Sequence, residues 1–103
     1  MKIEVCYTVH GVFNDPMPVK SSRPNADAKD ITKAVDYVAK HKAAAAHFYT
    51  NSAETVIYST YDGRINVEMH MAENSTDVLM PLEVRDVKKM LKGFLKVEQE
   101  AAA

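Results

Sequence analysis

The chain has 103 residues, of which 47% are apolar and 26% are charged, so it has room for one small hydrophobic core. Thirteen Lys and Arg residues nearly balance fourteen Asp and Glu residues, and the net charge of -1 gives no overall positive field for nucleic acid or an anionic membrane. The single cysteine, Cys6, excludes a disulfide within the chain, and no apolar run approaches the roughly 18 residues of a membrane span.

The N-terminus begins at once with alternating polar and apolar residues and lacks the apolar stretch of a signal peptide. We therefore expect a cytoplasmic protein. Residues 3–9 continue this alternation, which predicts a strand with one buried face. Residues 14–25 are rich in prolines and turn-forming residues, so they predict a long surface loop.

The first helix is predicted to begin after Asn25 or Asp27, because Asp27 and Asp30 have the spacing of a capping box. The alanines at residues 43–46 favour helix but lead into strand-forming residues, so we expect this helix to end between His41 and Ala45. Its inward stripe consists of Ile31, Ala34, Val35, Val38 and Ala39.

Three antiparallel strands are predicted next, at residues 46–51, 54–60 and 64–71, with a turn at Asp62-Gly63 between the last two. Residues 78–80 predict a short edge strand. Pro81 is expected in the first turn of a second helix, where its missing N–H would have no partner in any case. The apolar side of that helix consists of Val84, Val87, Met90, Leu91, Phe94 and Leu95.

These elements predict an α+β fold of two layers, in which two amphipathic helices cover one face of a mostly antiparallel sheet of four to five strands. The predicted order is one strand, one helix, four strands and one helix. We expect residues 1–97 to form a single domain and residues 98–103 to form a frayed tail.

The charges are divided unevenly between these elements. The helical segments, residues 27–42 and 82–97, contain nine positive and five negative residues, a surplus of four. The rest of the chain contains four positive and nine negative residues, a deficit of five. Solvated helix surfaces are one explanation of the lysines, and a phosphate-contacting surface is the other. In the first of these segments, Tyr37 is the only aromatic residue interleaved with the lysines.

No arrangement of residues in the sequence predicts catalysis. Cys6 and His10 share a strand face, but four strand residues span about 13 Å, which is beyond hydrogen-bond reach. The histidines lack the spacings of metal ligands, and we expect each of them to be solvated. They are His10, His41, His47 and His70. We therefore expect no catalytic residue, no metal site and no cofactor.

A resemblance to a known family rests on residues 55–69, a predicted strand, turn and strand, and on Val78-Leu79-Met80-Pro81, which leads into the helix at residues 84–91. From Asp30 to about Lys96 this order of elements resembles the first part of a DNA sliding-clamp domain of the bacterial type. Clamp domains have a short strand and a proline before a helix whose basic face lines the DNA channel. The resemblance implies DNA-facing roles for Arg85, Lys88, Lys89 and Lys92.

Two functions follow as hypotheses. The first is a small non-enzymatic binding protein that contacts another protein, such as the accessory and inhibitor proteins that phages and mobile elements encode. Its expected contact residues are Phe13, Met17, Lys33, Tyr37 and Lys40. The alternative is a DNA-associated, clamp-like protein that contacts duplex DNA through its lysine-rich helices. Self-association stays open for both hypotheses, and neither involves a membrane.

Overall fold

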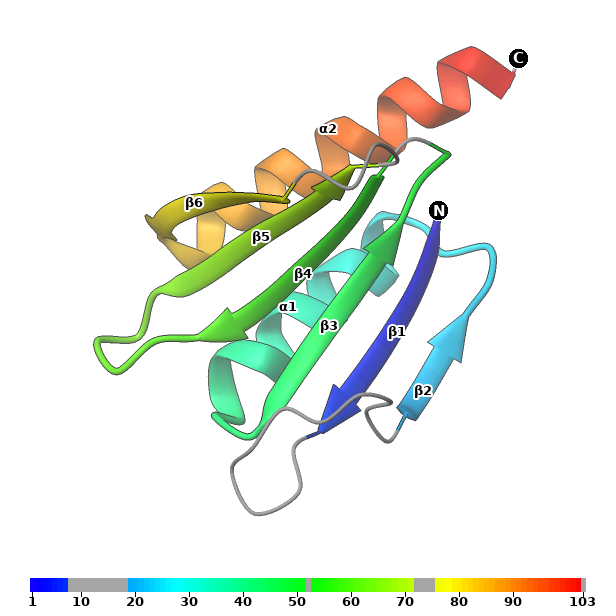
Figure 1. The fold of residues 1–103 in the computed structure, drawn as a ribbon. Helices are drawn as coiled ribbons and strands as arrows, with labels where there is room; N and C mark the ends of the chain where they lie inside the picture. Colours follow the sequence, from blue (N-terminus) through cyan, green and yellow to red (C-terminus); the bar gives the residue numbers. More distant parts are fainter. Residues whose placement is uncertain (8–18, 52, 72–75, 103) are drawn as a thin grey trace.

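A computed structural model describes residues 1–7, 19–51, 53–71 and 76–102, with the backbone alone for residues 76–80. Six strands form one sheet, and two helices cover one of its faces (Figure 1). The elements in chain order are β1 (Lys2–Tyr7), β2 (Val19–Arg23), α1 (Ala28–Lys40), β3 (Ala44–Tyr49), β4 (Ala53–Ser59), β5 (Ile65–Met71), β6 (Thr76–Leu82) and α2 (Val84–Ala102). The predicted α+β class with two helices on one face is confirmed.

The sheet has the strand order β2-β1-β3-β4-β5-β6, and every neighbouring pair is antiparallel. It therefore has one or two strands more than the four to five expected. The extra strand is β2, so the predicted loop at residues 14–25 is wrong over residues 19–23. The sequence does not mark this strand, because all five of its residues are exposed and none alternates with a buried neighbour. Backbone pairing with β1 holds it, with Arg23 opposite Ile3 and Ser21 opposite Val5.

The start of α1 follows the prediction. The Asp30 N–H donates to Asp27 Oδ1 at 3.0 Å, and the Asp27 N–H donates to Asp30 Oδ2 at 3.0 Å, so the capping box is confirmed. The helix ends at Lys40 with His41 as its C-cap, at the beginning of the expected window. It does not continue through the alanines, because Ala44, Ala45 and Ala46 are buried in β3 between β1 and β4.

One core lies between the helices and the sheet. The residues expected on the inward stripes of both helices are buried or half-buried there. Full burial of a Val, Leu, Ile or Phe side chain contributes about 1.5–3 kcal/mol to the stability of the fold. On the sheet side, Ile3, Phe48, Ile57 and Val67 are at most 2% exposed. The helix side is built from Ile31, Val35, Val38, Val87, Leu91 and Leu95.

One expectation near the C-terminus needs a change. Pro81 lies inside β6 rather than in the first turn of α2, which begins at Val84. An edge strand accepts proline, because one side of its backbone has no strand partner among the described residues. The helix α2 extends through Ala102 and includes residues 98–102. Glu98 Oε1 lies 2.6 Å from the amino group of Met1.

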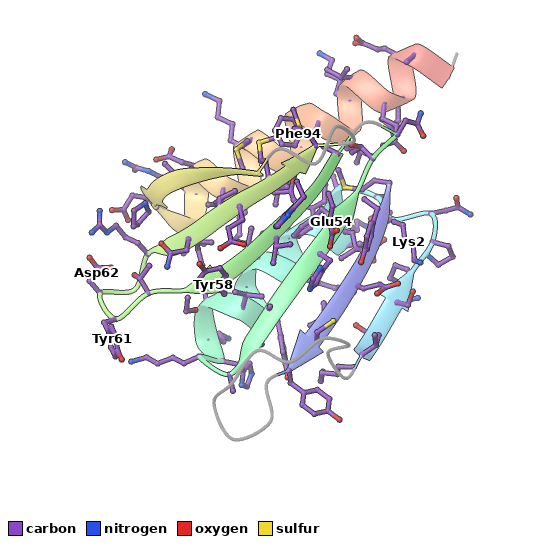
Figure 2. All side chains as sticks on the ribbon, viewed as in Figure 1. Lys2, Glu54, Tyr58, Tyr61, Asp62 and Phe94 are labelled. Atoms are coloured by element: carbon purple, nitrogen blue, oxygen red, sulfur yellow. The ribbon has the colours of Figure 1, made fainter. Side chains whose placement is uncertain are left out.

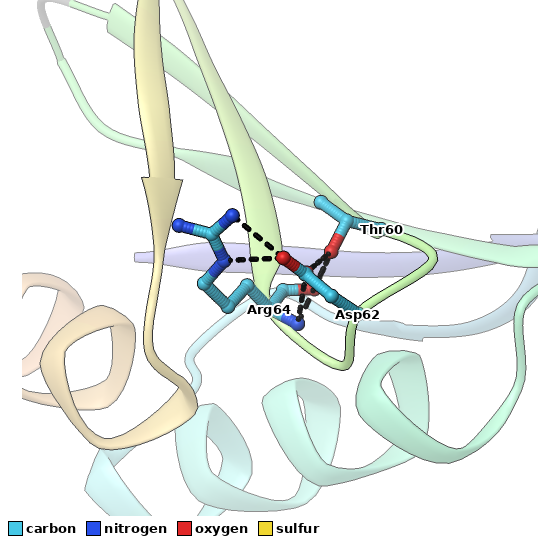
Figure 3. A network of polar contacts seen from close by, with 3 residues as sticks. All are labelled: Thr60, Asp62 and Arg64. Atoms are coloured by element: carbon cyan, nitrogen blue, oxygen red, sulfur yellow. Dashed lines mark hydrogen bonds and ion pairs between the residues drawn. The ribbon is translucent and has the colours of Figure 1, made fainter.

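The predicted turn at Asp62-Gly63 joins β4 to β5. Gly63 has φ of 82°, a left-handed conformation that L side chains rarely adopt. Figure 3 shows the polar network that supports it: Arg64 Nε and Nη2 donate to Asp62 Oδ2 at 2.9 and 2.6 Å, and the Thr60 hydroxyl donates to the other carboxylate oxygen. These contacts lower the pKa of Asp62, with the Arg64 guanidinium as the largest cause.

The two described glycines predict opposite effects of one substitution. Gly63→Ala is expected to lower the free energy of unfolding by about 1–2 kcal/mol, because alanine is strained at a positive φ. Gly93→Ala is expected to raise it by about 0.5–1 kcal/mol, because Gly93 lies inside α2 and an added Cβ meets nothing within 4 Å. Urea unfolding followed by circular dichroism measures both. A stabilising Gly63→Ala would contradict the turn geometry.

Candidate functional site

A basic groove lies between the edge strand β2 and helix α1. Its walls are Lys20, Ser21 and Arg23 from β2 and Asp30, Lys33 and Tyr37 from α1, and its floor is Ile3, Val5 and Ala34. The hollow encloses about 180 Å³. It forms because α1 packs over β1, β3 and β4, so β2 stands at the border of the helix layer. Register places Ser21 and Arg23 on the same sheet face as Val5 and Ile3, toward the helix side.

Tyr37 is the aromatic part of this groove. Lys20 Nζ lies 4.2 Å from the centre of the Tyr37 ring, within the range of a cation–π contact. The His41 ring packs against the same side chain, with ring centres 4.2 Å apart. The half-buried Tyr37 ring therefore joins the groove to the C-terminal end of α1.

The groove carries a local positive charge. Lys20, Arg23 and Lys33 are exposed, and none of them makes an ion pair with another described residue. Asp30, the single carboxylate among the described residues of the groove, accepts a hydrogen bond from the Asp27 N–H and so belongs to the capping box of α1. Three cations therefore remain available to an anionic partner.

A second hollow continues the positive surface onto α2. It encloses about 330 Å³, is more open than the groove, and is lined by Ala28, Lys29, Thr32, Lys33 and Lys92. We call it the lysine depression. Lys33 lines both hollows, so cations from β2, α1 and α2 form one continuous band. This band consists of Lys20, Arg23, Lys29, Lys33 and Lys92.

The structure brings together only some of the residues predicted to contact a partner protein. Lys33 and Tyr37 both line the groove. Lys40 is exposed at the end of α1 and lines neither hollow. Phe13 and Met17 lie outside the described residues. Sequence reasoning missed Lys20, Ser21 and Arg23, because it placed them in a loop and counted their charges with the acidic remainder.

The four residues with implied DNA-facing roles all lie on α2, but they are not equivalent. Lys88 Nζ lies 2.6 Å from Asp36 Oδ1 of α1, so its charge is paired within the protein. Lys92 lines the lysine depression. Arg85 and Lys89 are exposed and line neither hollow.

The sheet face that the helices leave uncovered, turned toward the viewer in Figure 2, carries histidines, tyrosines and carboxylates. His47 Nδ1 lies 2.5 Å from Glu54 Oε1, and the Tyr58 hydroxyl donates to Glu68 Oε1 at 3.0 Å. The expectation that every histidine is solvated is wrong for His47, whose side chain is 17% exposed. Its burial follows from its place on a central strand, between β1 and β4.

Cys6 is buried, and burial raises the pKa of its thiol, with the Glu4 and Glu54 carboxylates adding to the effect. The neutral thiol is a poor nucleophile. His10, which the sequence places on the same strand face as Cys6 but beyond hydrogen-bond reach, lies outside the described residues. Within the described ranges, no group of three or more His, Cys, Asp or Glu residues could hold a metal ion.

An apolar hollow of about 270 Å³ lies at the far end of α2, away from the basic groove. Phe94 and Val97 of α2, Ala53 of β4, and Met69 and Met71 of β5 line it. Val97 is 66% exposed at its border. Among the described residues of the lining, Glu98 is the only charged one, so converging charges like those of the basic groove are absent from this described part.

The half-buried phenol of Tyr49, on the uncovered sheet face, makes the stability of the protein depend on pH. Burial, with the Glu54 and Glu4 carboxylates, raises its pKa to about 12. A tyrosine in the unfolded chain ionises near pH 10. Above that pH, the unfolded chain therefore binds fewer protons than the folded protein does. As a result, the free energy of unfolding falls as the pH rises toward 12. We expect Tyr49→Phe to reduce this fall, measured by urea unfolding at a series of pH values.

The matched control is Tyr61→Phe, because the Tyr61 side chain is fully exposed at the tip of the β4–β5 turn (Figure 2). This variant should lose stability with pH as the parent protein does. An identical loss in Tyr49→Phe and the parent would show that Tyr49 ionises without cost in the folded state.

Comparisons with known proteins found no match to this chain among family models, curated proteins or solved structures. The resemblance to a sliding clamp therefore stays a prediction from the sequence pattern. Neither α1 nor α2, the helices of the described part, is long and apolar enough to cross a bilayer.

Proposed function

We propose that this chain is a small non-enzymatic binding protein that acts by docking an acidic segment of a partner protein in the basic groove. The observation that carries the proposal is the composition of that groove, where three cations that form no ion pair with another described residue line the same hollow as a half-buried tyrosine. Among the described residues of the groove, the only carboxylate is engaged in a helix cap. An accessory or inhibitor protein works in this way, through contact rather than chemistry.

Charge complementarity supports this assignment. Cations at the rim of an interface accelerate encounter with an acidic partner and disfavour basic ones, while a central aromatic residue with apolar surroundings supplies contact area. Tyr37 is placed for the second role, beside Ile3, Val5 and Ala34 of the groove floor.

The position of β2 adds a backbone contribution. β2 is an end strand in the strand order, so one of its edges has no strand partner among the described residues. An extended segment of a partner can pair with such an edge through main-chain hydrogen bonds. Its acidic side chains would then run past Arg23 and Lys20, which border the groove.

A charge-reversal pair tests the proposal. Lys20→Glu with Lys33→Glu is expected to weaken binding of a fluorescent glutamate-rich peptide about tenfold or more, because two of the three cations of the groove change sign. Fluorescence anisotropy at low ionic strength measures the affinity. The matched control is Lys89→Glu with Lys96→Glu, which changes the net charge equally but lies outside both hollows.

Equal weakening by the two double variants would mean that the peptide senses net charge alone, which contradicts a groove-specific site. Undetectable binding of the peptide to the parent protein at low ionic strength would also contradict it. Affinity capture of partners from cells with the parent and the Lys20→Glu, Lys33→Glu protein then shows which captured proteins depend on the groove.

A DNA-associated, clamp-like function is the second candidate, and the lysine depression is the observation that favours it. Lys29, Lys33 and Lys92 converge there from two helices, as phosphate contacts would require. The paired state of Lys88 with Asp36 weakens this candidate, because binding through Lys88 would have to break that ion pair.

The DNA candidate predicts binding to duplex DNA that weakens steeply as salt rises, because released counterions drive such binding. Lys88→Glu with Lys89→Glu should weaken it further. A filter-binding or anisotropy titration over a range of salt concentrations measures both effects. Absent binding at low ionic strength, or affinity that does not change with salt, would remove this candidate.

A further inference from the structure

The charges that line the basic groove do not cancel. Among the described residues that line it, Lys20, Arg23 and Lys33 bring three positive charges and Asp30 brings one negative charge, which leaves +2. A single Asp or Glu side chain of a partner would neutralise half of this charge. A phosphate monoester carries about -1.5 to -2 at neutral pH and so matches the groove in full.

The hydrogen-bond donors of the groove also suit a phosphate group. The Arg23 guanidinium offers a planar fork for two phosphate oxygens, and the ammonium groups of Lys20 and Lys33 act as point charges. Ser21 adds a hydroxyl donor from the same strand. These groups come from two elements that face each other across one hollow.

The size of the groove favours one anionic group over a series of them. Its volume of about 180 Å³ lies below the roughly 300–1,000 Å³ of sites that enclose a whole small molecule. A nucleic acid backbone would need repeated phosphate contacts, whereas the groove is a single concave site with room for one phosphate group. Lys29 and Lys92, beyond the shared Lys33, remain available to acidic residues that flank the anion.

We infer that the basic groove binds a phosphorylated side chain of a partner protein, held by Lys20, Arg23 and Lys33 with Ser21. This inference rests on the proposed function and specifies the chemical group that the groove recognises. It predicts a protein whose attachment to its partner depends on phosphorylation of that partner.

Three peptides of one glutamate-rich sequence test it, with serine, phosphoserine or glutamate at the central position. In anisotropy titrations of the intact protein, the phosphoserine peptide should bind about tenfold more tightly than the serine peptide, and also more tightly than the glutamate peptide. Arg23→Lys keeps the charge but removes the fork, so it should reduce the preference for phosphoserine several-fold. Lys96→Ala, outside both hollows, should leave that preference unchanged.

The outcomes separate the two levels of the proposal. Equal binding of the phosphoserine and glutamate peptides, both weakened by Lys20→Glu with Lys33→Glu, would overturn the phosphate inference and leave the acidic-segment function standing. Absence of binding to all three peptides would overturn both. Tighter binding of a 5′-phosphorylated oligonucleotide than of the phosphoserine peptide would overturn a protein source of the phosphate and favour the DNA candidate.

Discussion

The pairing of β1 with its two neighbours is the constraint on which the basic groove depends. On one edge, residues 2–7 pair with β3, where Ile3 stands opposite Phe48. On the other edge, β1 holds β2, which brings Arg23 opposite Ile3. The same strand supplies the groove floor through Ile3 and Val5. If β1 left the sheet, α1 would lose part of the surface on which it packs, and β2 would lose its only strand partner among the described residues.

Periodicity in the sequence was enough to predict most of the fold. Each helix shows its apolar stripe, Asp27 marks the start of α1, and the Asp62-Gly63 turn marks the hairpin of β4 and β5. The errors fall where tertiary contacts outweigh local preference. β2 has no buried residue, so its sequence shows no alternation that would predict a strand. Pro81 is typical of a helix start, but an edge strand also accommodates proline. The buried alanines of β3 favour helix on propensity, yet strand pairing on both sides places them in the sheet.

The candidate site was predictable only on its helical side. Lys33 and Tyr37 are separated by one helical turn, so their common face follows from the period of the helix. Lys20 and Arg23 reach the same place through strand pairing, which depends on β1 and leaves no pattern within residues 19–23. For this reason the division of charge into basic helices and an acidic body was incomplete. The positive band begins on the sheet edge and continues across both helices.

The connection between the two walls of the groove has a thermodynamic consequence. β2 ends at Arg23 and α1 begins at Ala28. Two contacts hold the segment between them: the Ala26 N–H donates to the Met1 carbonyl at 2.9 Å, and Asp27 forms the capping box of α1. The walls are therefore preorganised, and a ligand need not order the backbone around it. If a partner binds in the groove as proposed, the entropy lost on binding would fall mainly on the long side chains of Lys20, Arg23 and Lys33 and on the partner itself.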